Sequence, residues 1–177
     1  MKRQDKKFDL VVVGGGHAGI EAALIAHKRG VKTLLISMDK NSVGRTSCNP
    51  AVGGLAKGQM VKEVDVLGGM MGAFADLSTL QSKTLNKSKG RSVWSPRSQI
   101  DKNLYEKIAQ GYIKKVGLEV LEAEVVSLYI KNNSILGVFL RDKTKISCSS
   151  VVLTCGTFLN GLIHIGKEQI KAGRYGE

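Results

Sequence analysis

The stretch FDLVVVGGGHAGIEAALIAHKRG, residues 8–30, decides the fold. Its residues 10–13 form a short apolar run, which is typical of a strand buried on both faces. Glycines follow in GxGxxG spacing, at Gly14, Gly16 and Gly19. An alanine-rich amphipathic pattern then runs to Gly30, and a second apolar run occupies residues 33–36. The order predicts strand, tight turn, helix and strand, which is most of a βαβ unit.

The turn has the residues that a dinucleotide site needs. Gly14 permits a sharp reversal, Gly16 lets a diphosphate approach the backbone, and Gly19 lets the helix lie close to the strand. The N–H groups of the turn and the positive end of the helix dipole would then bind the phosphates. The alternative is a turn with no ligand, and the ordered strands and helix favour the dinucleotide site.

Two side chains near the turn have open roles. Asp39 lies about 20 residues beyond the loop, where an acidic residue can hold the ribose hydroxyls, but it can equally fall just past the end of the second strand. His17 lies inside the loop, and we interpret it as a polar loop residue in preference to a base or a ligand.

Composition is consistent with one domain, residues 1–177, with an excess of positive charge. The net charge is +12, from 27 Lys and Arg against 15 Asp and Glu, which permits an acidic partner such as RNA but does not demonstrate one. The three cysteines show neither a CxxC motif nor zinc spacing, so we expect no metal site and a reducing, cytoplasmic location. The glycines and charges after residue 13 argue against a signal peptide, and no apolar run is long enough to span a membrane.

The segment that follows the βαβ unit is glycine-rich and irregular. Residues 41–58 predict a loop of about 18 residues, and a loop of that length inside a compact domain is usually functional. Cys48 lies in its middle, before Asn49 and Pro50, and is either an activated thiol or a small buried residue. Apolar residues at helical spacing then predict a helix that ends at Gly68.

A basic segment comes next. Residues 81–107 carry two acidic residues and seven basic ones, Lys83, Lys87, Lys89, Arg91, Arg97, Lys102 and Lys107. Trp94 and Tyr105 lie among them, and cations interleaved with aromatic rings suit single-stranded nucleic acid. A solvated surface with one core tryptophan is the alternative.

The remaining chain predicts a helix and then a small sheet. Residues 98–117 predict an amphipathic helix with Ile100, Leu104 and Ile108 on one face. Alternating apolar residues from 126 to 148 predict a small antiparallel meander, which leads to an apolar strand at 151–153. A βαβ unit, a meander and a returning strand with a small-residue end are expected of an FAD-binding domain. The predicted fold class is therefore α/β, a Rossmann-like FAD-binding domain with a parallel sheet and a β-meander.

Six blocks of the sequence resemble the glucose-inhibited division protein A family (MnmG), flavin enzymes that modify the wobble uridine of certain tRNAs. The blocks are GGGHAGIEAA (14–23), SCNPAVGG (47–54), KGQMVKEVDVLGG (57–69), LNKSKG (85–90), WSPRSQIDKNLY (94–105) and VLTCGTFLNGLIHIG (152–166). Two residues, Arg91 and Ser92, depart from the Pro-Ala usual in the family.

The resemblance implies the site residues and the reaction. FAD would lie on the turn residues Gly14, Gly15, Gly16, His17, Ala18 and Gly19, with its adenine end near Val125. Cys48 would lie beside the flavin ring and assist chemistry at the uracil. The family adds an aminomethyl or carboxymethylaminomethyl group to C5 of the uridine, using NADH and methylenetetrahydrofolate, as a homodimer working with the GTPase MnmE.

Members of the family are several times longer, so we expect this chain to be an N-terminal portion that ends within the flavin domain and is inactive alone. Two other hypotheses remain open at this stage. One is a different FAD- and NADH-dependent oxidoreductase, and the other is a nucleotide-binding module without turnover.

Overall fold

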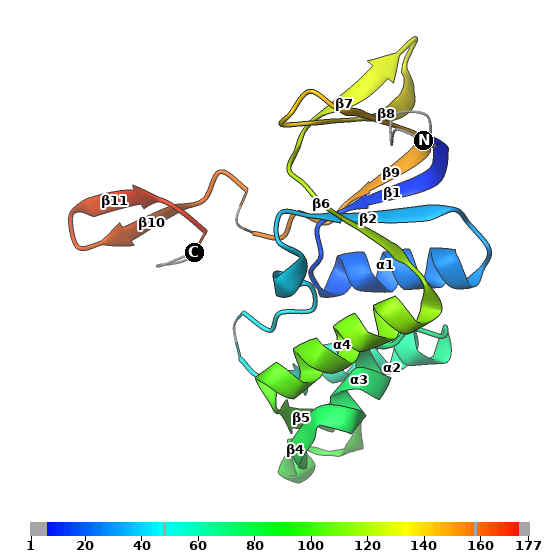
Figure 1. Cartoon of the computed structure of the whole chain (residues 1–177). Coiled ribbons are helices and arrows are strands. Elements are labelled where there is room, and N and C mark those ends of the chain that lie inside the picture. The colour runs from blue at the N-terminus through cyan, green and yellow to red at the C-terminus, as the bar shows by residue number, and fades with distance from the viewer. Residues whose placement is uncertain (1–6, 48, 158, 174–177) are drawn as a thin grey trace.

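The computed structural model describes residues 7–47, 49–157 and 159–173, which form a mixed six-stranded sheet, a three-stranded sheet, a two-stranded sheet and four α-helices (Figure 1). The large sheet has the strand order β6-β2-β1-β9-β8-β7. The strands are β1 Lys7–Val13, β2 Thr33–Ser37, β3 Ala51–Gly53, β4 Thr79–Leu85, β5 Ser95–Ile100, β6 Glu119–Glu122, β7 Val125–Lys131, β8 Ser134–Leu140, β9 Lys145–Leu153, β10 Leu162–Ile165 and β11 Glu168–Lys171. The helices are α1 His17–Lys28, α2 Lys57–Val66, α3 Met71–Ser78 and α4 Lys102–Val116.

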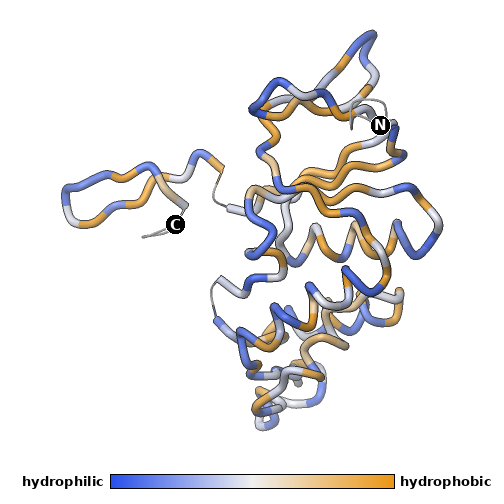
Figure 2. The backbone as a smooth tube through the Cα atoms, in the orientation of Figure 1, coloured by the Kyte–Doolittle hydropathy of each residue, from blue (hydrophilic) through white to orange (hydrophobic). Residues whose placement is uncertain are grey.

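The predicted βαβ unit is confirmed. β1 and β2 pair in parallel, with Val11 opposite Leu34 and Val12 opposite Leu35, and all four side chains are buried. Figure 2 shows these central strands as the most continuous apolar part of the chain. Helix α1 covers one face of the sheet, because its Ile20, like Ala23 and Leu24, belongs to the same core cluster as Val12 and Leu35. The Rossmann-like α/β fold class is thus present.

The meander is also present, but its last strand and the returning strand are one element. The start of β9 pairs antiparallel with β8, with Ile146 opposite Val138, and the rest pairs parallel with β1, with Val151 opposite Val11. The sequence pattern predicted two separate strands here, because the serine-rich residues 147–150 in the middle of β9 interrupt the apolar pattern. A single strand therefore joins the meander directly to the parallel sheet.

The edge strand β6 was not predicted. It pairs in parallel with β2, with Leu121 opposite Ile36, and its four residues EVLE contain a glutamate at each end. Only Leu121 of the four is buried, so the strand lacks the apolar run that marks the central strands. Its end lies beside the end of β2, where Ala123 N donates to Ser37 O at 2.9 Å.

A second sheet, β3-β5-β4, and helix α3 were not predicted from the sequence. The helix predicted from residue 98 begins later, because residues 98–100 belong to β5 and the Asp101 side chain caps α4 by accepting from Leu104 N at 2.9 Å. The predicted apolar face is right in part, because Ile100 is buried and Ile108 packs against the main core cluster. Leu104 is exposed, and the buried face of α4 carries Tyr105, Ala109 and Ile113.

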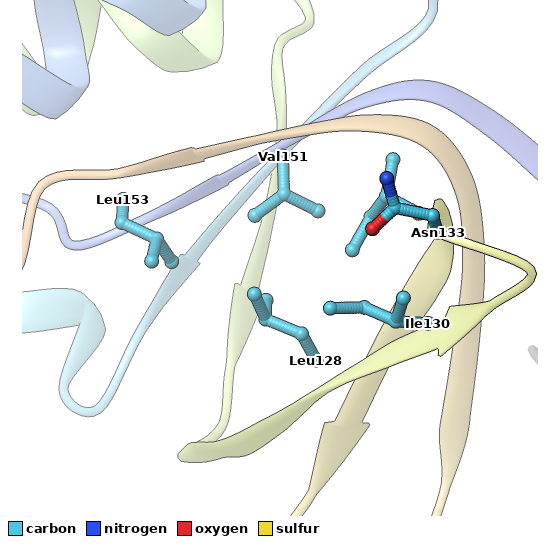
Figure 3. A pocket seen from close by; sticks show the side chains of 6 residues that line it. Leu128, Ile130, Asn133, Val151 and Leu153 are labelled. Carbon is cyan, nitrogen blue, oxygen red and sulfur yellow. The ribbon is translucent and has the colours of Figure 1, made fainter.

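The meander leaves an apolar groove of about 320 Å³ on the sheet face away from the helices. In Figure 3 the side chains of Leu128 and Ile130 from β7 approach Val151 and Leu153 from β9 across this groove. The β10–β11 hairpin stands apart from the rest of the molecule in Figure 1. Among the residues that the structure describes, no helix has the length and apolar character to cross a membrane.

Candidate functional site

The glycine turn joins the carboxyl end of β1 to the start of α1, at the edge where the parallel strands end. Gly14 has a φ of +113°, and its N–H donates to Ile36 O at 2.8 Å, so the turn is bound to the end of β2. A Cβ at Gly14 would lie 2.3 Å from Thr154 O. Gly14 therefore serves both the reversal and the close approach of the chain that follows β9.

Gly19 brings the helix against the turn. A Cβ at this position would lie 1.8 Å from Gly14 O and 2.7 Å from Thr154 Oγ1. The Thr154 hydroxyl itself lies 2.8 Å from Val13 O and 3.1 Å from Gly14 O, so it satisfies the carbonyls at the end of β1. The predicted packing role of Gly19 agrees with this geometry, and Thr154 is a supporting residue that sequence reasoning did not assign.

Gly16 differs from its neighbours, because a Cβ there would meet no atom within 4 Å. It is exposed, as is Ala18, and it is the N-cap of α1 with φ −74° and no side-chain cap hydrogen bond. The first N–H groups of a helix lack partners inside the helix, and the dipole places positive charge at this end. The open space over Gly16 thus fits a diphosphate, whose oxygens would take the place of a capping side chain.

Gly15 closes the inner side of the turn. It is buried, and a Cβ there would lie 2.8 Å from Val43 Cγ2 and 3.0 Å from Ser37 Oγ. The turn therefore presents its outer edge, at Gly16 and Ala18, to solvent while its inner edge packs on the end of β2. One side of the turn is available to a ligand.

His17 is the first residue of α1 and does not lie in the loop as we expected. Its ring packs edge-on against Tyr105, with 5.5 Å between the ring centroids, and burial lowers the pKa of the imidazole below its usual value. Its buried Nδ1 has no hydrogen-bond partner among the described residues. The imidazole is therefore kept neutral beside the turn, and its backbone N–H belongs to the helix end.

Asp39 follows β2 by two residues, in agreement with the alternative that placed it just past the strand. Its Oδ1 accepts from Asn41 N at 2.8 Å and so caps the 3₁₀ turn Lys40–Ser42. Val125 begins β7, close after Ala123, which donates to Ser37 at the end of β2. Both residues lie at the sheet edge that carries the glycine turn, so their predicted roles toward the ribose and the adenine stay predictions.

The segment predicted as a long loop, residues 41–58, is held by hydrogen bonds before position 48 and contains a short strand after it. Gln110 of α4 holds its first part, because Nε2 lies 3.0 Å from both Asn41 O and Val43 O. The short strand β3 then interrupts it, starting at Ala51. Cys48 lies outside the described residues, so its predicted role in chemistry stays a prediction. Of the other cysteines, Cys148 is buried and Cys155 is exposed.

The two aromatic residues of the basic segment have opposite environments. Tyr105 is 2% exposed, lies in the main core cluster and contacts both His17 and Phe74 edge-on. Trp94 is 40% exposed. The alternative with one core tryptophan was wrong, because the core aromatic residue is Tyr105 and Trp94 lies on the surface. The interpretation as a nucleic-acid surface stays a prediction.

A carboxylate on α1 connects the site to the helical layer. Glu21 accepts from Met70 N at 3.0 Å and from Met71 N at 2.6 Å, which are the first N–H groups of α3. A carboxylate at a helix N-terminus satisfies groups that have no partner inside the helix. Sequence reasoning missed this contact, since the two partners are about 50 residues apart and no local pattern joins them.

Sequence comparison then identifies the family. The sequence profile described as "Glucose inhibited division protein A" matches residues 9–177. The chain belongs to the glucose inhibited division protein A family. The match spans nearly all of the chain and includes the glycine turn and every strand that neighbours it.

Individual relatives agree with the family match. The tRNA uridine 5-carboxymethylaminomethyl modification enzyme MnmG of Endomicrobium trichonymphae is 46% identical over 174 residues, which cover 98% of this chain and 29% of the relative. The MnmG of Aquifex aeolicus is 47% identical, over 97% of this chain and 28% of the relative. The crystal structure of Aquifex aeolicus GidA superimposes with a TM-score of 0.92 over 97% of this chain and 29% of that one. The chain thus spans less than a third of the length of these relatives.

Proposed function

We propose that this chain is the FAD-binding portion of an enzyme that modifies the wobble uridine of tRNA. The observation that carries the proposal is the glycine turn. Its outer edge is open at Gly16, whereas a Cβ at Gly14, Gly15 or Gly19 would clash with neighbouring atoms. The family match adds the chemistry, because similar chains are named as tRNA uridine 5-carboxymethylaminomethyl modification enzymes.

In this proposal the chain positions the cofactor. The N–H groups at the start of α1 would bind the diphosphate and the backbone at Val125 would lie near the adenine, while the Asp39 carboxylate caps the 3₁₀ turn Lys40–Ser42. The bound flavin supplies the redox chemistry, with NADH and methylenetetrahydrofolate as co-substrates.

The residue proposed to act on the uracil ring is Cys48, in the loop between the 3₁₀ turn Lys40–Ser42 and β3. Its thiolate would act as a nucleophile toward the uracil ring. The partners proposed with it are the tRNA, the GTPase MnmE and a second copy of the full-length protein, in the cytoplasm.

A chimeric protein tests this function. This chain replaces the corresponding 28% of Aquifex aeolicus MnmG, and the wobble uridine of tRNA is analysed by mass spectrometry after incubation with FAD, NADH, methylenetetrahydrofolate, glycine and MnmE. We expect modified uridine from the chimera and none from its Cys48→Ser variant. A chimera that is folded and holds FAD but leaves the uridine unchanged would contradict the proposal.

A further inference from the structure

The hairpin made of β4, the 3₁₀ turns Lys87–Lys89 and Arg91–Val93, and β5 carries an unbalanced positive charge. We call residues 79–100 the basic arm. Between Asp76 and Asp101 the sequence contains no acidic residue and five basic ones, Lys83, Lys87, Lys89, Arg91 and Arg97. Four of the five are exposed, and within the described part of the chain none of the five forms an ion pair. Figure 1 shows β4 and β5 beyond α3 and α4, on the side away from the large sheet.

An exposed aromatic ring lies at the tip of the basic arm. Trp94 is held by its own backbone N–H, which donates to Arg91 O at 3.2 Å, and by Nε1, which donates to Lys87 O at 3.2 Å. The guanidinium carbon of Arg91 lies 5.8 Å from the centroid of the indole ring. The ring is thereby fixed in orientation beside a planar cation while much of its surface stays open to solvent.

The tip of the basic arm needs two residues with positive φ, and the sequence supplies an asparagine and a glycine there. Asn86 and Gly90 both have positive φ, at 59° and 92°, and these two residues start the two 3₁₀ turns. Arg91 follows Gly90 directly. It supplies the guanidinium that lies over the Trp94 ring.

The basic arm is bound along β5 to residues 50–54, which include β3. Pro50 O accepts from Ile100 N at 2.8 Å, and Gly54 N donates to Pro96 O at 2.8 Å. The buried Ser95 hydroxyl donates to Gly54 O. Strand β3 pairs with β5 along this boundary, so the arm and β3 form one sheet. A ligand on the arm would be held in a fixed relation to residues 50–54.

We propose that the basic arm binds single-stranded RNA, with one base stacked on Trp94 and the backbone phosphates neutralised by Lys87 and Lys89. The inference rests on the proposed function and adds to it a surface for the RNA substrate. Lysines alone would attract any polyanion, but a fixed indole beside a guanidinium offers a stacking surface for a planar base. The carboxylates of an acidic protein surface would use the cations of the arm but would leave the exposed indole without a stacked partner.

The test uses the purified chain with a fluorescein-labelled oligouridylate and a labelled anticodon stem-loop RNA, followed by fluorescence anisotropy over a range of salt concentrations. Trp94→Ala should weaken binding by about 5- to 150-fold, and Trp94→Phe should retain most of it, because a base stacks on either ring. Lys87→Ala with Lys89→Ala should reduce the salt slope by about 1.4, since two phosphate contacts are lost. The matched control removes two exposed lysines at the end of α4, with Lys114→Ala and Lys115→Ala, and should leave both quantities unchanged.

Trp94 is the single tryptophan of the sequence, so the unmodified chain gives a second readout. Stacking of a base should quench its emission and protect it from acrylamide, whether or not a variant folds. The inference is overturned if saturating RNA leaves the tryptophan emission unchanged. It is also overturned if the control pair loses as much affinity as the arm pair, or if the arm binds vesicles of anionic lipid while RNA binding is unaffected by the arm variants.

Flavin content measured in the same samples separates this inference from the proposed function. A chain that binds RNA through the arm but holds no FAD would contradict the proposed function and support the arm as an RNA-binding surface. A chain that holds FAD, with RNA binding unaffected by Trp94→Ala, would contradict the inference about the arm and support the flavin site.

Discussion

Replacement of Gly16 by alanine should separate folding from cofactor binding. A Cβ at Gly16 meets no atom within 4 Å, and the φ of −74° is one that alanine adopts readily. The folding cost is then limited to the poorer N-cap, at most about 1 kcal/mol of unfolding free energy. The added methyl group nevertheless occupies the space that we assign to the diphosphate.

The expected loss of affinity follows from the contacts at the helix end. A charge-assisted hydrogen bond from a backbone N–H to a phosphate oxygen contributes about 1.5–3 kcal/mol. If the methyl group of Gly16→Ala displaces one such contact, the Kd for FAD should rise by about 10- to 150-fold. The assay is a titration of the apoprotein with FAD, followed by flavin fluorescence, with urea unfolding of the same samples.

Gly111→Ala is the matched control for Gly16→Ala. Gly111 is exposed in the interior of α4, and a Cβ there also meets nothing within 4 Å. The change should stabilise the chain by about 0.5–1 kcal/mol and leave FAD binding unchanged. A folded Gly16→Ala protein with wild-type affinity for FAD would refute the assignment of the open space to the diphosphate.

Three further changes test the packing and electrostatics around the turn. Gly19→Ala should destabilise the chain by about 2–4 kcal/mol in urea unfolding, because its Cβ would lie 1.8 Å from Gly14 O, and a wild-type midpoint would contradict this geometry. Glu21→Ala should cost about 1–3 kcal/mol by leaving two N–H groups of α3 without an acceptor, and Glu21→Gln, which keeps one acceptor oxygen, should cost less in the same assay. Burial lowers the pKa of His17, so the unfolded chain binds its proton first and stability falls as the pH drops below about 6.5. His17→Phe should flatten that decline by up to about 1.4 kcal/mol per pH unit, and an unchanged pH dependence of urea unfolding would show that the imidazole is not the group responsible.

The sequence was sufficient for the parts of the fold that depend on local pattern. The glycine turn was readable from its GxGxxG spacing: Gly14 and Gly19 leave no room for a side chain, and Gly16 leaves open the space that we assign to the diphosphate. The meander was readable because β7 and β8 alternate and are joined by a two-residue Asn-Asn turn with positive φ, at Asn132 and Asn133. In both cases the partners lie close together in the chain.

The small sheet and α3 could not be predicted from the sequence, because local patterns do not mark them. β4 reads TLQSKTL and is mostly exposed, so it shows no apolar alternation, and it is held by pairing to a β5 that is also largely polar. β3 pairs with a strand more than 40 residues away, with Val52 opposite Ser98. Strand formation there depends on tertiary contacts that no local window contains.

The aromatic residues show how a spacing argument can select only part of the buried face. Leu104 and Ile108 share a face with helical spacing, but so do Tyr105, Ala109 and Ile113, and the second set is buried. The i, i+4, i+8 pattern of the second set was available as a signal. A tyrosine among lysines was interpreted as a surface residue, whereas its ring packs on His17 and Phe74.

The central claim is that the outer edge of the glycine turn binds the diphosphate of FAD. Isothermal titration of the purified chain with FAD, and in parallel with riboflavin, tests it most directly, since riboflavin has the same ring system and no diphosphate. The account predicts saturable binding of one FAD per chain and at least about tenfold weaker binding of riboflavin, the equivalent of one lost phosphate contact. Equal affinity for the two flavins, or no heat with either, would contradict it.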